Sequence, residues 1–465
     1  MLELFNKNQN RVKKVGIIIF LVYIFCLCCG IATNTGFDTA PDEEMKYDVC
    51  TYIAENMKLP HGGDESIRDE IWGISYAFTP ILSYMISAIF MRITMIFTQN
   101  SFYIFVAARM VSVICFIVYA LICIKISKKL FKGIYAGLFV ALVTMLPQMV
   151  YLGSYLNNDS LALMSIAIII YSWILGLESN WSWKSCNILA IGLGICALSY
   201  YNAYGYILCS IFIYIISCIL KKVNVKEFFK KGLAIAGIAL LIGGWWFVRS
   251  YIMYDGDFLG LNVSREYGEL YAQEPYKPSN RGTPANNGQT LQYMLNNLQW
   301  IETTKESFIG RFGYMNVVMD TNIYETYEMF FKISLIGLVF GIVLSVIIKI
   351  RKKEEKQELD VIGKNKKENI LFNVIMIICI IIPIALSIYY SYFNDFQPQG
   401  RYIMPIIIPF MYFITTGVKN IFDFVIRNKK IKNIVLSLII FIWTLMPLYI
   451  SVTYIIKSLN VNQVI

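Results

Sequence analysis

Long apolar runs separated by short charged segments dominate the pattern of residues along the chain. Each run is near the roughly 20 residues that a helix needs to cross a hydrocarbon core of about 30 Å. The runs lack the strict alternation of membrane-barrel strands, so they are expected to be helices. Eleven runs are recognised, at residues 15–33, 102–124, 134–152, 159–177, 187–202, 204–220, 232–253, 328–348, 370–390, 402–418 and 434–456. The pattern predicts an all-α polytopic membrane protein with about eleven transmembrane helices.

One further apolar segment, residues 76–97, decides the topology, because every later loop changes side if it crosses. Positively charged residues concentrate in cytoplasmic loops. Four basic clusters occur between the runs: Lys125, Lys128, Lys129 and Lys132; Lys221, Lys222, Lys226, Lys230 and Lys231; Lys349, Arg351, Lys352, Lys353, Lys356, Lys364, Lys366 and Lys367; and Arg427, Lys429, Lys430 and Lys432. All four share the cytoplasm with the N-terminus only if residues 76–97 lie along the outer surface. We therefore predict an interfacial helix there, which suits its Pro80 and Arg92.

This topology gives one transmembrane domain over residues 1–465, with most of its non-membrane mass outside the cell. The first outer loop is expected at residues 34–101 and a second large one at 254–327, with a shorter loop at 391–401. Residues 349–369 are expected to form a charged cytoplasmic linker. The chemistry is therefore expected on the extracytoplasmic face.

Composition excludes several classes of protein. The 465 residues are 57% hydrophobic and only 15% charged, whereas soluble domains carry roughly 25% charged residues. The net charge of +10 follows from the basic clusters and does not indicate nucleic-acid binding. His61 is the only histidine, so serine–histidine triads and HExxH metal sites are excluded.

The loop after the first run carries an acidic block, FDTAPDEEMKYD, at residues 37–48. It is either a solvated loop or the place of a catalytic base such as Asp42. Its other carboxylates are Asp38, Glu43, Glu44 and Asp48.

Other ionisable residues fall near the outer ends of the runs rather than at mid-span: Arg109, Asp159, Arg249 and Arg401. An ion-coupled transporter would keep such groups near the midplane, so a surface enzyme is favoured. Plain alternatives remain: the arginines at 109 and 249 can extend to lipid headgroups, and Asp159 can cap a helix. Arg401, in NDFQPQGRYIMP, is suited to hold a phosphate bidentately.

Two motifs of the second outer loop are weaker signals. ESFIGRFGYMN, residues 306–316, offers Arg311 as a cation and Tyr314 as a ring that could stack on a sugar or fill the loop. YDGDFLG, residues 254–260, offers Asp255 and Asp257, which fit a divalent ion or an ordinary turn. We assign no metal ligand, and a divalent cofactor stays open.

Together these segments resemble the GT-C superfamily of membrane glycosyltransferases. APDEE resembles the acidic motif of the family's first loop, TPILSYM its surface helix, and AARMVSVI the arginine-led span that follows. WWFVRSYIMYDGDFLG, GRFGYMN and QGRYIMP resemble an uncharacterised bacterial branch related to protein O-mannosyltransferases.

The resemblance implies a lipid-linked sugar donor and an extracytoplasmic site. Asp42 takes the place of the family's proposed base and Glu43 that of its neighbour, while Arg401 would hold the donor phosphate, helped by Arg249 or Arg311. The bacterial branch often has histidine where this chain has Lys46. We expect Lys46, Asp159, Tyr314 and Arg109 to contact substrate. Glu43 and Glu44 are expected to raise the pKa of Asp42 by like-charge repulsion.

The predicted function is transfer of a sugar from a polyprenyl-phosphate donor to a glycan, lipid or protein acceptor at a bacterial plasma membrane. Attack assisted by the carboxylate base would invert the anomeric carbon. Two alternatives remain at this point: a flippase or exporter of lipid-linked glycans, and a non-catalytic envelope-assembly protein. No nucleic-acid partner is expected.

Overall fold

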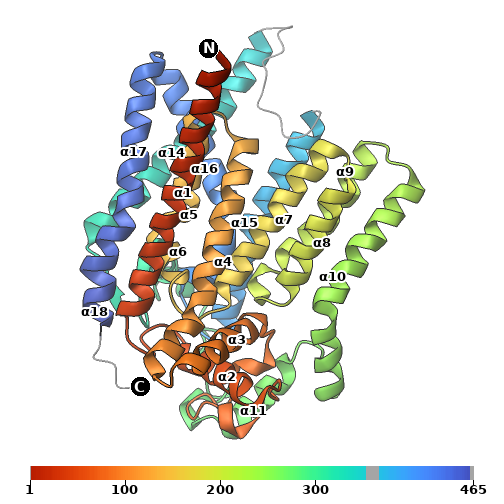
Figure 1. Cartoon of the computed structure of the whole chain (residues 1–465). Helices are drawn as coiled ribbons and strands as arrows, with labels where there is room; N and C mark the ends of the chain where they lie inside the picture. The colour runs from red at the N-terminus through yellow and green to blue at the C-terminus, as the bar shows by residue number, and fades with distance from the viewer. Residues whose placement is uncertain (1, 352–365, 461–465) are drawn as a thin grey trace.

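The computed structural model describes residues 2–351 and 366–460, and this part of the chain is mainly helical (Figure 1). The bundle comprises α1 (Leu2–Asn34), α4 (Ser101–Leu130), α5 (Ile134–Thr144), α6 (Pro147–Leu152), α7 (Asp159–Ser179), α8 (Trp183–Ala197), α9 (Gly205–Leu220), α10 (Val225–Met253), α14 (Thr321–Arg351), α15 (Lys366–Phe393), α16 (Ile407–Val425), α17 (Lys429–Ile450) and α18 (Lys457–Leu459). Its connections carry α2 (Glu43–Asn56), α3 (Leu82–Phe97), α11 (Leu261–Tyr271), α12 (Leu291–Asn296), α13 (Trp300–Gly310), the strands β1 (Arg311–Phe312) and β2 (Val317–Val318), and the 3₁₀ segment η5 (Gly400–Ile406).

The expected spans all coincide with helices. Within the described residues, nine helices are long and apolar enough to cross a membrane. The two remaining expected spans, 134–152 and 187–202, coincide with the shorter helices α5, α6 and α8. The chain is thus a multi-pass membrane protein.

The expected single helix over residues 134–152 is wrong in detail, because it is broken between α5 and α6. Leu146 has φ −75° and ψ 133°, which is extended backbone, and Pro147 is the first residue of α6. Proline disfavours helical geometry at the residue before it and cannot continue the hydrogen-bond ladder. The break redirects the chain inside the bundle, just before the α6–α7 connection.

Small residues allow α14 and α16 to pack closely. Gly337 and Gly341 form a GxxxG pattern on α14, which faces Gly417 and Asn420 of α16. A Cβ on Gly417 would lie 1.8 Å from the carbonyl oxygen of Ser334. Glycine at this position is therefore a packing requirement.

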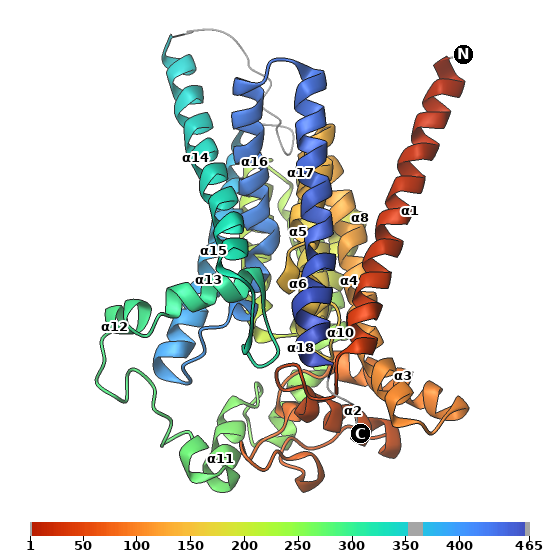
Figure 2. The same cartoon turned by 90° about the vertical axis from the view of Figure 1, so that its left-hand side faces the viewer.

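The two ends of the bundle differ in character. The α9–α10 and α16–α17 connections lie at the end where α1 begins, whereas α2, α3 and α11 lie at the end where α18 finishes (Figures 1 and 2). α3 lies across that end rather than along the bundle, as expected for an interfacial helix (Figure 2). The linker expected at 349–369 falls mostly outside the described residues.

A second hydrophobic cluster attaches this elaborated end to the bundle. It joins side chains of α2 and α3 to those of α4 and α10, including Val49, Tyr84, Ala108 and Trp246. The loop that carries the acidic block is therefore held against the membrane helices.

Candidate functional site

The candidate site begins at the turn before α2, where the backbone sets the direction of Asp42. Asp42 has φ 57° and ψ 28°, in the left-handed region. Aspartate tolerates this conformation better than most residues. The Asp42 carboxylate is directed to Arg401, whose Nη2 lies 2.8 Å from Oδ2. Asp42 and Arg401, which are 359 residues apart in sequence, are thus brought together by the fold.

Close packing sets the position of Arg401. A Cβ on the preceding Gly400 would lie 2.0 Å from the backbone nitrogen of Phe308, so only glycine lets η5 approach α13 this closely. Arg401 is buried and also donates from Nη2 to the hydroxyl of Tyr402 at 3.0 Å. Its Nε is buried and has no hydrogen-bond partner among the described residues.

Lys46 lies one helical turn after Asp42 and is also buried. Its Nζ is 3.8 Å from Asp42 Oδ2 and donates to the carbonyl oxygen of Pro41 at 2.6 Å. The ring of Tyr76 lies beneath this ammonium group, 5.2 Å away. Burial lowers the pKa of Lys46 to about 8, although Asp42 and Asp159 act in the opposite direction.

Asp159, the first residue of α7, completes the group of charges. The capping role considered for it is wrong, because the Asn157 side chain accepts the Ser160 amide at 2.9 Å. Asp159 is only 7% exposed. Its charge acts on Lys46, so the site gathers the carboxylates of Asp42 and Asp159 with the cations of Lys46 and Arg401.

The expected raised pKa of Asp42 is wrong. Burial raises the pKa of Asp42, but Arg401 and Lys46 together outweigh burial and lower it well below its ordinary value. Glu43 does not supply the expected repulsion at this site, because its carboxylate is held by Arg109. Asp42 is thus ionised at any ordinary pH.

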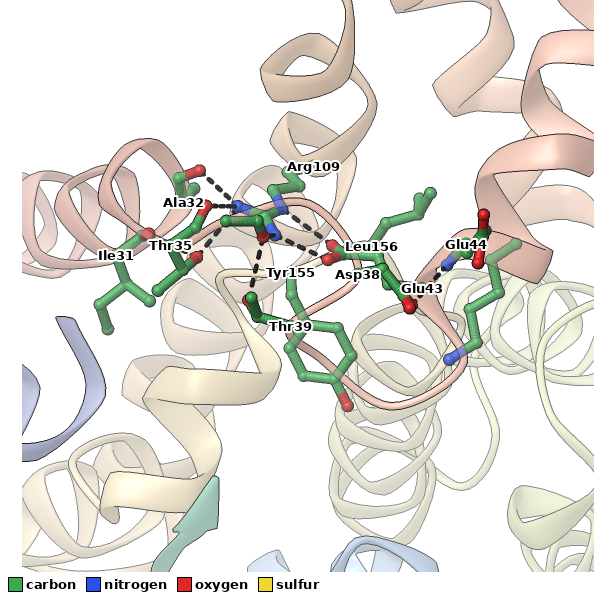
Figure 3. A network of polar contacts seen from close by, with 12 residues as sticks. Ile31, Ala32, Thr35, Asp38, Thr39, Glu43, Glu44, Arg109, Tyr155 and Leu156 are labelled. Atoms are coloured by element: carbon green, nitrogen blue, oxygen red, sulfur yellow. Dashed lines mark hydrogen bonds and ion pairs between the residues drawn. The ribbon is translucent and has the colours of Figure 1, made fainter. Parts of the chain in front are cut away.

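The guanidinium of Arg109 is enclosed by the protein. It is completely buried, and its guanidinium donates to both carboxylate oxygens of Glu43, at 2.8 and 2.6 Å. The other donors bind the carbonyl oxygens of Ala32, Thr35 and Gly36 at 2.7 to 2.9 Å (Figure 3). All five N–H donors are engaged within the protein, so Arg109 does not extend to lipid headgroups and has no donor free for the substrate contact expected of it.

Glu43, expected beside the base, is likewise engaged by contacts within the fold. It is fully buried, and its Oε1 also accepts the Leu156 amide at 3.0 Å. The Glu43–Arg109 pair therefore ties the end of α1, the start of α2, α4 and the α6–α7 connection together (Figure 3). We call this pair and the groups it binds the clamp. Since Asp42 directly precedes Glu43, the clamp fixes the position of Asp42.

The other two arginines expected to bind phosphate make different contacts. Arg249 donates to the carbonyl oxygen of Pro60 at 2.6 Å and stacks on Trp246. Arg311 forms an ion pair with Glu306 at 3.0 Å. Each cation is therefore committed to its own part of the fold, and their expected help to Arg401 is not supported.

Tyr314 lies at the edge of the site. It sits in the turn between β1 and β2 and donates a hydrogen bond to Asp38. The Tyr314 ring is 53% exposed, so it remains available to a ligand. The neighbouring Phe308 and Phe312 are buried and fill the core.

Sequence reasoning missed the tyrosines that line the site. Tyr76 and Tyr155 lie beside Lys46, and Tyr402 binds Arg401. The chain has 32 tyrosines, most of them in apolar surroundings, so no single one stands out in the sequence. Only adjacency to Arg401 could have identified Tyr402.

The residues considered for a divalent ion act as ordinary turn residues. Asp257 accepts the amides of Asn262 and Val263 at 2.7 and 3.1 Å and so caps the start of α11. Within the described residues, no three His, Cys, Asp or Glu side chains form a group that could hold a metal ion.

Comparison with solved structures assigns the fold. The oligosaccharyltransferase AglB from Archaeoglobus fulgidus, in complex with an inhibitory peptide and a dolichol-phosphate, is 12% identical, with a TM-score of 0.53 over 96% of this chain and 56% of that one. Its apo form is 11% identical, with a TM-score of 0.51 over 97% and 56%. ArnT from Cupriavidus metallidurans bound to undecaprenyl phosphate is 10% identical, with a TM-score of 0.49 over 87% and 60%. The chain thus spans little more than half the length of these structures, and it shares the fold of AglB.

Sequence comparison assigns the family. No curated protein sequence shows significant similarity to the chain. A profile of predicted membrane proteins (DUF2142) matches residues 56–411, which is most of the chain. The chain therefore belongs to the DUF2142 family of predicted membrane proteins.

Proposed function

We propose that the protein is a membrane glycosyltransferase that moves a sugar from a polyprenyl-phosphate donor to an acceptor hydroxyl. The observation that carries the proposal is the ion pair between Asp42 and Arg401 at the elaborated end of the bundle. It places a candidate base and a candidate phosphate ligand side by side. The shared fold supports the proposal, as does the dolichol-phosphate bound by AglB.

In the proposed reaction, the acceptor hydroxyl attacks the anomeric carbon from the face opposite the phosphate. A new carbon–oxygen bond forms while the bond to the phosphate oxygen breaks, and the anomeric configuration inverts. The hydroxyl proton passes to Asp42, and the electron pair of the broken bond leaves with the phosphate. Arg401 neutralises the departing phosphate and Lys46 adds a second positive charge.

The lowered pKa of Asp42 requires an activating step. Arg401 is shared in this scheme, because a donor phosphate competes with Asp42 for the same guanidinium. When the phosphate engages Arg401, Asp42 loses its strongest stabilising partner and its pKa rises. The carboxylate would therefore become a better base only when the donor is bound.

The test is transfer by the purified protein in liposomes containing polyprenyl-phosphate hexoses. Released polyprenyl phosphate and new glycosidic bonds are measured together. Asp42→Asn is expected to slow transfer by about 10²–10⁴-fold, the usual contribution of a general base. Asp48→Asn is the matched control, since it removes a half-buried carboxylate from the same helix.

Two results would contradict the proposal. Unchanged turnover in Asp42→Asn would exclude this residue as the base. Movement of lipid-linked glycan across the bilayer without a new glycosidic bond would instead support a flippase. Mass spectrometry of envelope glycans from a deletion strain would identify the acceptor.

A further inference from the structure

A cavity of about 190 Å³ lies where three connections distant in sequence meet. Trp72 comes from the first loop, Tyr276 and Arg281 from the second, and Asp395 and Phe396 from the third. This cavity is separate from the group of charges around Asp42 and takes no part in the proposed reaction.

Backbone hydrogen bonds between the loops fix the walls of the cavity. The Gln273 amide donates to the carbonyl oxygen of Ile71 at 3.1 Å, which joins the second loop to the first. The Ala285 amide donates to the carbonyl oxygen of Tyr392 at 3.2 Å, which joins the second loop to the end of α15. The cavity is therefore largely pre-formed, as ligand sites usually are.

The lining combines aromatic rings with one cation and one carboxylate. The Trp72 and Tyr276 rings lie 5.0 Å apart, edge to face, and the Arg281 guanidinium lies 5.1 Å from the Trp72 ring. Burial raises the pKa of Asp395, and Arg281 partly opposes this shift. A sugar ring has an apolar C–H face for such rings and hydroxyls that suit a carboxylate acceptor and guanidinium donors.

A chain of hydrogen bonds connects the cavity to Asp42. Gln397 donates to Asp395 and accepts from the hydroxyl of Tyr402. That hydroxyl accepts from Arg401, which also binds Asp42. Three side chains thus separate the cavity wall from the candidate base, which places the cavity within reach of a second ring of a bound glycan.

We propose that this cavity is an acceptor subsite, which holds a sugar ring of a glycan acceptor while the neighbouring hydroxyl is glycosylated. The proposal rests on the proposed function and narrows its acceptor from glycan, lipid or protein to a glycan. Tyr276 and Trp72 stack on the ring, while Asp395 and Arg281 bind its hydroxyls.

The test is saturation-transfer NMR on the full chain in nanodiscs, with methyl glycosides of glucose, mannose and N-acetylglucosamine and with a methyl glucuronide. At least one glycoside is expected to receive saturation at its ring C–H protons. Tyr276→Ala and Asp395→Asn should each weaken this binding by about tenfold, the worth of one buried contact of this kind. Tyr293→Ala removes an exposed tyrosine of α12 and is expected to leave binding unchanged.

These outcomes distinguish the acceptor subsite from the proposed glycosyltransferase activity. Saturation transfer that persists in Asp42→Asn but is lost in Tyr276→Ala supports the subsite, whatever the rate of sugar transfer by Asp42→Asn. If none of the glycosides receives saturation from the wild type, the subsite is overturned. Equal saturation transfer in wild type, Tyr276→Ala and Asp395→Asn would overturn the subsite as well, even if the protein were established as a glycosyltransferase.

Discussion

Two neighbouring carboxylates, Asp42 and Glu43, take different roles because their surroundings differ. The Asp42 side chain is 28% exposed, beside Arg401, whereas Glu43 is fully buried against Arg109. Adjacent residues at the start of a helix do not face the same way. One acid is thus available for chemistry, while the other orders the backbone that carries it.

The pKa of Lys46 predicts how sugar transfer depends on pH. Below about pH 8 the buried amine is protonated and can help hold a donor phosphate, and above that pH it becomes neutral. The transfer rate of the wild type should therefore fall as pH rises through about 8. Before the donor binds, Arg401 and Lys46 lower the pKa of Asp42, so its carboxylate stays ionised and the rate at limiting donor should show no acid-side loss down to about pH 5.

Lys46→Arg isolates this effect, since guanidinium keeps its charge at all accessible pH values. The variant should lose the alkaline decline, whatever its maximal rate. Rates measured over the pH range at limiting donor concentration give the result, because they report the groups of the free protein. An alkaline decline that persists in Lys46→Arg would assign it to another group.

The buried clamp should be far more important for stability than an exposed ion pair. Arg109→Met leaves the Glu43 carboxylate buried without its partner and is expected to lower the free energy of unfolding by about 3–5 kcal/mol. Lys129→Met breaks the half-exposed pair with Glu178, at 2.7 Å, and should cost less than about 1 kcal/mol. A thiol-reactive dye can follow unfolding, because nine of the chain's 11 cysteines are buried.

A double variant tests the physical cause. Combining Arg109→Met with Glu43→Leu removes both buried charges and should recover part of the lost stability. Strictly additive losses would mean that the two residues act independently of each other.

At the scale of elements, apolar run length predicted the membrane helices well, because the lipid core fixes how long a spanning helix must be. It could not show that Pro147 ends α5 within an apolar run. It also could not gather Tyr76, Tyr155 and Tyr402 around Lys46 and Arg401, because they come from segments far apart in sequence. Asp42 and Arg401 could be expected at the same end of the bundle, because the charge pattern places both in loops on the same side of the membrane.

The contact between α14 and α16 gives a prediction at this scale. Gly417→Ala places a Cβ against the backbone of α14, which must move to relieve the clash. We therefore expect a lower melting temperature. Sugar transfer should also be slower, because α16 continues directly from the segment that carries Arg401.

Gly237→Ala in α10 is the matched control. No heavy atom lies within 4 Å of its added Cβ, so only the gain in helix propensity of up to about 1 kcal/mol applies. Its melting temperature should equal or exceed that of the wild type. Equal melting temperatures for Gly417→Ala and the wild type would show that the two helices separate at little cost.

At the scale of the whole molecule, the proposed function depends on the orientation of the chain in the membrane. The α9–α10 and α16–α17 connections carry basic residues and lie at one end of the bundle, while α2 and α11 lie at the other (Figure 1). Asp42 directly precedes α2 and contacts Arg401, so the site belongs to this second end. From the positive-inside rule we predict that the first end lies in the cytoplasm and the site outside the cell. A donor that spans a leaflet and an acceptor in the envelope can meet only there.

This orientation predicts the labelling of two cysteine variants in intact cells. Tyr293→Cys on α12 and Lys429→Cys at the start of α17 are both exposed, but at opposite ends. A membrane-impermeant maleimide should label Tyr293→Cys directly and Lys429→Cys only after permeabilisation, with the wild type correcting for its own cysteines. The reverse order of labelling would place Asp42 and Arg401 in the cytoplasm, where an extracytoplasmic donor and acceptor could not reach them.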